Sequence, residues 1–428
     1  MTNQSVLFRL SACVALSTAC GFASDPEVEN RVNQYFASES AVERASLVRS
    51  LRKEEFAEVE AAVRAGATAK PQKETDAVIQ RTLTTEYGRR EFETLVYIPG
   101  NYTPQKRYKL LVALHGTGGH GSGYIQAWLP WLRKRHDIIL AAPTITGEPW
   151  GGSRTAHSHV HTLIKQLSQE FAIDADRVYL DGMSMGGHAA FRIGCFRADR
   201  FAGLICRAHG PIFLPDAKGG GPRFLENLNN TPLYWIVGQT DPGIPIERMR
   251  RGQARLQELK YDVTYLEKPG GHEAYLDEND NILKWIEDNK RELYPKQIVF
   301  HTNRPDYQRM GWVEIAKFAG RPPATVRTLD FEGKTAGTRK EYLQNAVVNA
   351  TCDRATNSIV ASTKGVRQLG IYLSDEMLDL DAPVKIRVNG RLLWQKPLRR
   401  SLEILLEDSR LRGDRSMVYS ARVVLNVP

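Results

Sequence analysis

Residues 178–187 read Val-Tyr-Leu-Asp-Gly-Met-Ser-Met-Gly-Gly, an apolar run that leads directly into the pentapeptide Gly182-Met183-Ser184-Met185-Gly186. A serine flanked by glycines at this spacing is typical of a sharp turn from a strand into a helix, because larger side chains two positions before or after the serine would clash. The turn presents the hydroxyl at the helix N-terminus. Since a five-residue pattern also arises by chance, a nucleophilic Ser184 requires support from the surrounding sequence.

An acid and a histidine follow Ser184 in the order that such a turn requires. Asp241 follows the apolar run 233–237, and His272 follows the run 263–266 in a Pro-Gly-Gly turn. Taken singly, they would be a turn residue and a loop histidine. Together, at the ends of expected parallel strands, they would meet at one edge of a sheet. We therefore predict that Ser184 attacks an acyl carbon, His272 transfers the proton, and Asp241 orients the imidazole.

A glycine-rich loop at 115–123, His-Gly-Thr-Gly-Gly-His-Gly-Ser-Gly, follows the continuous apolar run 109–114. Such a run is typical of a strand buried on both faces of a parallel sheet. Because small residues leave backbone N–H groups open, we predict that the amides of Thr117 and Met185 stabilise an oxyanion. The alternative, a phosphate-binding loop, lacks the glycine and lysine spacing that such loops need.

At the Ser184 motif and at the start of the 115–123 loop, the chain resembles the α/β-hydrolase superfamily. Within it, the chain is similar to the secreted esterases that include poly(3-hydroxybutyrate) depolymerases, feruloyl and acetylxylan esterases, and prolyl-oligopeptidase-like hydrolases. The resemblance covers about residues 76–293. It implies a mostly parallel eight-stranded sheet with helices on both faces, acyl transfer through an acyl-enzyme, and no cofactor. The fold defines neither the acyl nor the alcohol part of the substrate.

The hydrophobic pattern predicts the same α/β fold class, because apolar runs alternate with helical periods in one large domain at 76–293. The expected strands are 77–83, 92–98, 109–114, 137–142, 178–180, 204–207, 233–237 and 263–266, and the expected helices are 124–135, 160–171, 187–196, 246–259 and 276–290.

The first residues have the pattern of a secretory signal. Residues 6–20 are apolar with a single charge, and small residues precede a cleavage point after Ala23. We therefore expect a signal peptide at 1–23 and export to the periplasm or the extracellular space; a buried helix and a lipid anchor on Cys20 are the alternatives. The stretch is too short for a transmembrane segment. The charged segment 24–75 has apolar positions at helical spacing, which predicts two or three short helices.

The region 294–428 alternates apolar and polar residues, which predicts a small β-rich accessory domain. The alternating runs are 297–301, 359–362, 370–373, 384–388 and 418–425. Asn389-Gly390 between two of these runs predicts a two-residue hairpin. The domain would either bind a carbohydrate or polymer, or cover the hydrolase. Exposed side chains of Trp312, Tyr372 or Trp394 would favour binding, and buried ones would favour a cover.

Cysteine and charge restrict the remaining possibilities. Once residues 1–23 are removed, Cys195, Cys206 and Cys352 remain, so at most one bridge can form; a Cys195–Cys206 bridge and two core thiols are the options. The formal net charge is +9. No nucleic-acid motif accompanies it, so we expect no nucleic-acid partner; the positive charge fits an anionic polymer or a plain solvated face.

Four histidines and one tryptophan outside the predicted triad are further candidate site residues. His157 and His161 share a helix face, His159 does not, and no Glu or Cys joins them at a standard spacing, so we predict no metal site. His115 and Trp150 are candidate substrate-binding residues, although Trp150 fits a core position equally well.

The sequence thus predicts an exported serine hydrolase that cleaves carboxylic esters, with an ester substrate linked to a polysaccharide or a polymer. Two alternatives stay open. One is a serine peptidase of the prolyl-oligopeptidase type, which normally carries a large propeller domain. The other is a binding protein on an inactive hydrolase fold. Loss of ester turnover in Ser184→Ala with binding retained would separate catalysis from binding.

Overall fold

The computed structural model describes residues 25–66, 69–85, 89–145, 154–210, 224–329 and 335–428. The chain forms two compact units, Met1–Ala65 and Gly66–Pro428. The predicted signal peptide, its Cys20 and Trp150 lie outside the described residues. No described helix is both long enough and apolar enough to cross a membrane.

The first unit contains three short helices, as the sequence predicts: α1 (Pro26–Ala37), α2 (Ala41–Leu51) and α3 (Phe56–Ala65). Side-chain caps start two of them, because Asp25 accepts a hydrogen bond from the Glu27 amide and Ser40 accepts one from the Glu43 amide. The helices bury their apolar stripes, with Val32, Leu51, Val59 and Val63 inaccessible to solvent.

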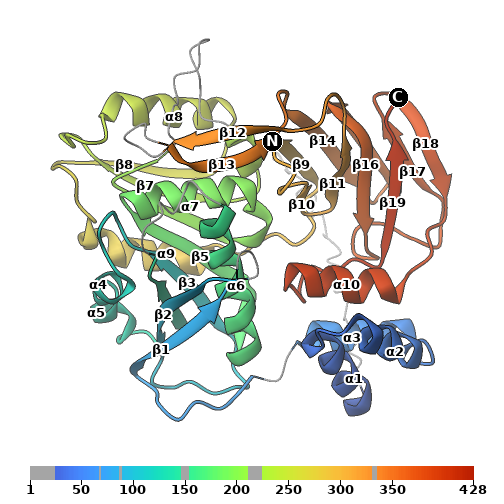
Figure 1. Ribbon diagram of the computed structural model, residues 1–428, viewed down its shortest axis with the longest axis horizontal. Coiled ribbons are helices and arrows are strands. Elements are labelled where there is room, and N and C mark those ends of the chain that lie inside the picture. The colour runs from blue at the N-terminus through green and yellow to red at the C-terminus, as the bar shows by residue number, and fades with distance from the viewer. Residues whose placement is uncertain (1–24, 67–68, 86–88, 146–153, 211–223, 330–334) are drawn as a thin grey trace, which may run out of the picture. The chain divides into compact units, whose positions relative to one another are not determined.

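The second unit is built on an eight-stranded sheet (Figure 1). Its strands are β1 (Ala77–Thr84), β2 (Glu91–Ile98), β3 (Tyr108–Leu114), β4 (Ile138–Pro143), β5 (Ile173–Met183), β6 (Gly203–Arg207), β7 (Leu233–Gly238) and β8 (Val263–Lys268). Their order is β1-β2-β4-β3-β5-β6-β7-β8, and β2 alone runs against the others. The predicted α/β fold class and all eight predicted strands are confirmed.

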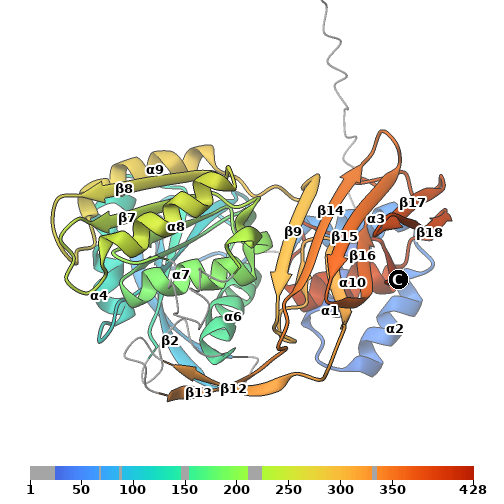
Figure 2. The ribbon, with the colours of Figure 1, turned by 90° about the horizontal axis from the view of Figure 1, so that it is seen from above.

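Helices cover both faces of this sheet. They are α4 (Gly121–Gln126), α5 (Leu129–Leu132), α6 (Arg154–Glu170), α7 (Met185–Phe196), α8 (Ile246–Glu258) and α9 (Asn279–Asp288), with short 3₁₀ turns at Ala198–Arg200, Leu225–Leu228 and Leu276–Glu278. Residues of α6, α7 and α8 share a core with Leu110 and Val112 of β3, whereas those of α4, α5 and α9 share one with Leu111 and Ala113. Alternate β3 residues therefore face opposite sides of the sheet, and Figures 1 and 2 show helices on both of these sides.

One predicted helix is interrupted. The expected helix at 124–135 is two pieces, and α4 ends at Gln126, four residues before Pro130. Proline has no N–H to donate, and its ring clashes with the carbonyl four residues earlier. Pro130 instead occupies the first turn of α5, where its missing N–H costs nothing.

The C-terminal part of this unit consists mainly of strands. They are β9 (Gln297–Thr302), β10 (Arg309–Met310), β11 (Val313–Phe318), β12 (Ala324–Leu329), β13 (Thr335–Glu341), β14 (Ala346–Asp353), β15 (Ser358–Lys364), β16 (Val366–Leu373), β17 (Val384–Val388), β18 (Arg391–Lys396) and β19 (Ala421–Asn426), joined by helix α10 (Leu402–Arg412). The predicted hairpin is present between β17 and β18, with positive φ at both Asn389 and Gly390. Those angles are what a two-residue type I′ turn requires.

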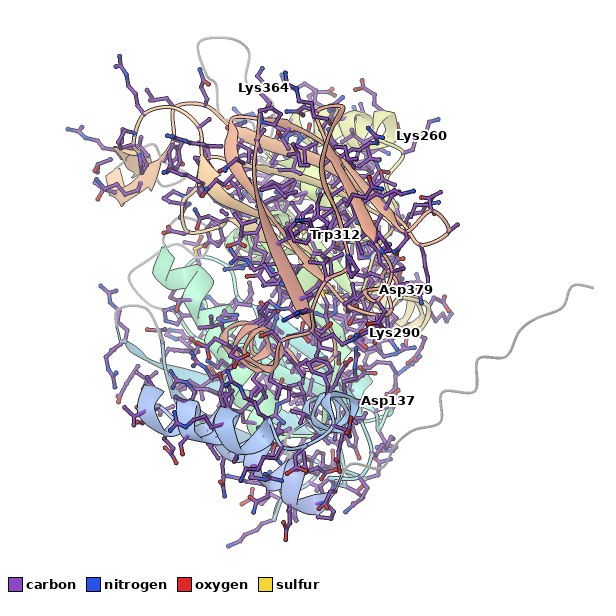
Figure 3. The ribbon with its side chains drawn as sticks, turned by 90° about the vertical axis from the view of Figure 1, so that its right-hand side faces the viewer. Asp137, Lys260, Lys290, Trp312, Lys364 and Asp379 are labelled. Carbon is purple, nitrogen blue, oxygen red and sulfur yellow. The ribbon has the colours of Figure 1, made fainter. Side chains whose placement is uncertain are left out.

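Two of the C-terminal sheets bury one face each. One has the order β10-β11-β16-β19 and the other the order β18-β17-β15-β14-β9. Trp312, labelled in Figure 3, is fully buried, and its indole N–H donates to the Pro295 carbonyl. Tyr372 and Trp394 are partly buried. The predicted β-rich character of this region is therefore confirmed, while its boundary at residue 294 stays a prediction.

Helix α10 was not predicted from the sequence, and strand β19 begins later than predicted. Ser401 caps the N-terminus of α10 by accepting from the Ile404 amide, and Gly413 ends it with φ 61°. Ser401 is a recognisable start signal in the sequence, and Gly413 is a recognisable stop signal. The run predicted at 418–425 becomes a strand only at Ala421, because the Tyr294 hydroxyl occupies the backbone N–H and C=O of Val418.

All three remaining cysteines are buried free thiols. Of the two options left open by the sequence, the structure shows core cysteines and no Cys195–Cys206 bridge. Burial raises the pKa of the Cys352 thiol to about 11.

A buried ionic cluster joins segments beside the eight-stranded sheet to the end of α10 and the residues that follow it. The Asp414 carboxylate lies 2.7 Å from Arg291, 3.3 Å from Arg200 and 3.4 Å from Arg412, and its side chain has no solvent exposure. Burial alone would raise the pKa of Asp414, but the three guanidinium groups hold it far below its usual range. The three guanidinium groups share Asp414 as a counter-charge, and Arg291 and Arg412 each have a second carboxylate, in Asp176 at 2.8 Å and Asp408 at 3.3 Å.

Replacing this carboxylate should destabilise the fold. We expect Asp414→Asn to lower the free energy of unfolding by about 3–5 kcal/mol, because it leaves the buried Arg200 without a carboxylate partner and removes a counter-charge shared by Arg291 and Arg412. Urea unfolding measures the change. Asp381→Asn is the control: it weakens an ion pair with Arg400 in which the carboxylate is 77% exposed, so its urea midpoint should stay close to that of the wild type. Equal losses in the two variants would contradict the prediction.

Candidate active site

The turn at Ser184 forms where β5 passes into α7. Ser184 has φ 55° and ψ −119°, a conformation that residues with side chains rarely adopt. Its amide donates to the Arg207 carbonyl over 2.9 Å, and its carbonyl accepts from His188 over 2.9 Å. The strained residue is thus held on both sides, and such strain is common at functional sites.

Glycines permit this turn because other backbone segments lie against it. A Cβ on Gly182 would be 2.2 Å from the Gly186 carbonyl oxygen, and a Cβ on Gly186 would be 2.0 Å from the Leu114 carbonyl oxygen. Real Cβ atoms do not approach backbone that closely. The predicted steric reason for both glycines therefore agrees with the structure.

Asp241 is buried just beyond the end of β7. Its Oδ1 accepts hydrogen bonds from the amides of Gly243 and Ile244, over 2.8 and 3.0 Å. Its Oδ2 lies 2.7 Å from His272 Nδ1. Two backbone donors therefore fix the carboxylate so that its second oxygen faces the imidazole.

His272 lies in the turn after β8 and connects the other two residues. Its Nε2 is 2.7 Å from Ser184 Oγ, while its Nδ1 contacts Asp241. The His272 side chain is 35% exposed and that of Asp241 is 1% exposed, so the imidazole lies between solvent and a buried carboxylate. The structure thus brings together the three residues to which the sequence assigns catalytic roles.

The 115–123 loop lies beside the Ser184 turn. A Cβ on Gly116 would be 3.4 Å from the Ser184 Cβ, so the next residue, Thr117, begins close to the serine. Among the described residues, neither the Thr117 amide nor the Met185 amide donates a backbone hydrogen bond. Two open donors therefore lie on either side of Ser184.

The His115 side chain supports this loop from inside. It is buried; its Nε2 accepts from the Ile145 amide over 3.2 Å, which leaves Nδ1 to donate to the Gly116 carbonyl over 2.8 Å. Burial lowers the pKa of His115, so the ring is neutral. Its predicted substrate contact stays a prediction, because in this arrangement the ring contacts the protein backbone.

Of the three α6 histidines considered as metal ligands, the side chain of His157 lies outside what the structure describes. His159 is buried and packs edge-on against Phe92, with ring centroids 4.4 Å apart. Burial lowers the pKa of His161 well below its usual value. No group of three possible metal ligands occurs among the residues that the structure describes.

Two features near the triad were missed in the sequence. Asp181 of β5 and Arg207 of β6 form a fully buried ion pair, with Arg207 Nε 2.8 Å from the carboxylate. His209 follows β6, its ring 4.9 Å from that of His188. Burial is the main cause that lowers the pKa of His209 to about 4. A charged residue inside an otherwise apolar strand is a signal that the sequence did offer.

Sequence relatives of the chain are esterases and thioesterases. It is 28% identical over 166 residues to probable feruloyl esterase C of Aspergillus terreus, covering 36% of the chain and 57% of that relative. It is 26% identical over 219 residues to acyl-protein thioesterase 1 of Gibberella zeae, covering 44% of the chain and 91% of the relative. The chain thus spans little more than half the length of the feruloyl esterases that it matches.

The chain has the α/β-hydrolase fold and is similar in sequence to the esterase group of that superfamily. At family level it groups with serine hydrolases of the esterase type. Among solved structures, a thermostable esterase aligns with a TM-score of 0.43 and 22% identity, over 50% of this chain and 64% of the other. No protein-family profile matches the chain.

The hydrolase should not tolerate a side chain at Gly186. We expect Gly186→Ala to cost about 3 kcal/mol, because the new Cβ would clash with the Leu114 carbonyl, which cannot move without shifting β3. Gly123→Ala is the matched control: it adds a methyl group to α4 with nothing within 4 Å. That change should raise stability by about 0.5–1 kcal/mol. Thermal unfolding of both variants measures these changes. A Gly186→Ala variant as stable as the wild type would refute the prediction.

Burial of His209 should make stability depend on pH. Its pKa is about 4 in the folded protein and about 6.5 when unfolded, so between these values only the unfolded chain binds the proton. Stability is therefore complete above pH 6.5 and falls toward pH 4. This residue should contribute a loss of about 2 kcal/mol between pH 7 and 4.5. Urea unfolding of His209→Asn should show a shallower decline than wild type; parallel declines would contradict the assignment.

Proposed function

We propose that the chain is a serine hydrolase that cleaves carboxylic esters through an acyl-enzyme on Ser184. The supporting observation is the hydrogen-bonded series Asp241–His272–Ser184, with 2.7 Å at each link. Distances in this range are those at which a base can take the proton of a nucleophile. Relatives named as esterases and thioesterases support the same type of reaction, which is hydrolysis at an acyl carbon.

The proposed reaction has two steps. His272 Nε2 removes the Ser184 hydroxyl proton as Oγ attacks the carbonyl carbon, and the imidazolium then returns the proton to the departing alcohol. Water, deprotonated in the same way, releases the acid from the enzyme. Asp241 holds the Nδ1–H tautomer and stabilises the imidazolium.

The oxyanion of each tetrahedral intermediate needs donors already in place. We assign this role to the amides of Thr117 and Met185, which flank Ser184 and carry no backbone hydrogen bond among the described residues. Preorganised donors of this kind contribute about 10²–10³-fold in rate. The glycines on both sides of Thr117 keep side chains away from this space.

The C-terminal strands belong to the structure of the hydrolase in this proposal. Trp312, one of the aromatic residues whose exposure would favour carbohydrate binding, is fully buried. Tyr372 lies under the Arg309 guanidinium, 3.4 Å from its ring centre. Because these aromatic rings are buried or covered, we favour the interpretation that the region covers the hydrolase, and not the interpretation that it binds a polymer.

The decisive test is labelling by a fluorophosphonate probe together with a substrate panel. We expect the probe to modify Ser184, and Ser184→Ala to lose labelling and at least about 10³-fold in kcat. Ser362→Ala, which changes an exposed serine on β15, is the matched control and should behave as wild type. The panel contains short-chain p-nitrophenyl esters, methyl ferulate, an acyl thioester and a peptide p-nitroanilide.

The panel also separates the alternatives. Turnover of the peptide anilide alone would replace the esterase proposal by the peptidase alternative. A folded protein that neither reacts with the probe nor hydrolyses any substrate would refute the proposed function and favour a binding protein.

A further inference from the structure

The ion pair of Asp181 and Arg207 lies inside the sheet, directly behind the Ser184 turn. Both side chains have no solvent exposure, and the two residues occupy neighbouring strands, β5 and β6. Removing two charges from water is costly, and well-packed apolar residues often stabilise a core at least as well. Stability alone therefore gives no reason for this pair, and its contacts have to be considered.

Arg207 touches both segments that carry the proposed proton transfer. Its backbone carbonyl accepts the Ser184 amide over 2.9 Å. Its Nη1 donates to the carbonyls of Ala274 and Tyr275, over 2.9 and 3.3 Å. Those carbonyls lie two and three residues after His272. One residue therefore contacts the serine turn through its backbone and the histidine loop through its side chain.

The guanidinium is itself held in one orientation. Nε donates to Asp181 Oδ1, and Nη2 donates to Asn279 Oδ1 over 2.7 Å. The group lies 4.9 Å from the Trp128 ring centre. Although burial alone would lower the pKa of Arg207, the Asp181 carboxylate raises it, so the group is a cation. Its planar set of donors faces four acceptor groups at once, which a lysine cannot reproduce.

The partner carboxylate is fixed equally well. Asp181 Oδ2 accepts from the Tyr124 hydroxyl over 2.8 Å and from the Trp128 indole over 2.9 Å. Asp181 also lies only three residues before Ser184. The network thus connects the strand before the nucleophile, helix α4 and the segment after His272.

We propose that Arg207 is a positioning residue that sets the distance between Ser184 and His272. The proposal rests on the proposed function, since it concerns the same proton transfer. The two residues are separated by 88 positions in the chain, so their 2.7 Å contact depends on how two loops are placed. Misplacement of reacting groups by about 1 Å can cost about 10²-fold in rate.

The test compares Arg207→Lys with a matched change elsewhere. Arg291→Lys is the control, because Arg291 is also buried and also donates to carboxylates, Asp176 and Asp414, and to a backbone carbonyl. None of these contacts involves the proposed triad. We expect R207K to lower kcat and the rate of fluorophosphonate labelling by about 10- to 100-fold, with KM within about 3-fold. R291K should lower the Tm but keep kcat within about 2-fold.

A second readout does not depend on turnover. The His272 Nδ1–H bonded to Asp241 should give a downfield proton resonance, and R207K should shift or lose that resonance while R291K retains it. Retention of both the resonance and kcat in R207K overturns the proposal. If wild type shows the resonance but no activity toward probe or esters, the proposed function fails, and the resonance in R207K still decides the positioning role.

A further variant covers the case in which R207K does not fold. Asp181→Leu combined with Arg207→Met removes both buried charges together, so no unpaired ion is left in the core. The same two readouts apply. A folded double variant with wild-type kcat and an unchanged His272 resonance would also overturn the proposal.

Discussion

The close approach of backbone segments at Ser184 is the constraint on which the hydrolase depends. The first turn of α7 lies against the ends of two strands at once, since a Cβ on Gly186 would reach the Leu114 carbonyl of β3 and one on Gly187 would lie 2.7 Å from the Arg207 carbonyl of β6. Those strands are the two neighbours of β5. The strand order, the glycines and the exposed serine are therefore consequences of one packing requirement.

The strands of the sheet and their mostly parallel arrangement could be predicted from sequence, because each strand is marked by its own local run of residues. Each central strand is a run of apolar residues, and the right-handed crossover rule then arranges those runs. The positions of Asp241 and His272 followed from their places after such runs. The Arg207 network could not be predicted in this way, because its acceptors at 181, 274, 275 and 279 become neighbours only in the folded sheet.

The C-terminal region shows the limit of pattern reading more clearly. Alternation found most of its strands, but it concealed α10, whose Ser401 and Gly413 caps are short signals next to long apolar patterns. The alternating pattern also does not predict how the C-terminal region packs against the rest of the unit. Asn227 donates to the Cys195 and His301 carbonyls and accepts from the His301 amide, and Phe196 stacks on Tyr307 at 4.6 Å. These contacts make the region part of the hydrolase structure.

The Asp414 cluster has a consequence for how the chain is made. Arg291 meets Asp414 across 123 residues of sequence, and Arg200 meets it across 214. During synthesis from the N-terminus, both arginines emerge long before their shared counter-ion. Arg291 already has Asp176 as a partner, at 2.8 Å, but Arg200 pairs with no other carboxylate among the described residues and must stay hydrated until Asp414 emerges, because a buried unpaired cation is too costly. The eight-stranded sheet can therefore collapse early around its apolar strands, but the turn that carries Arg200, between α7 and β6, is completed only after nearly the whole chain has left the ribosome.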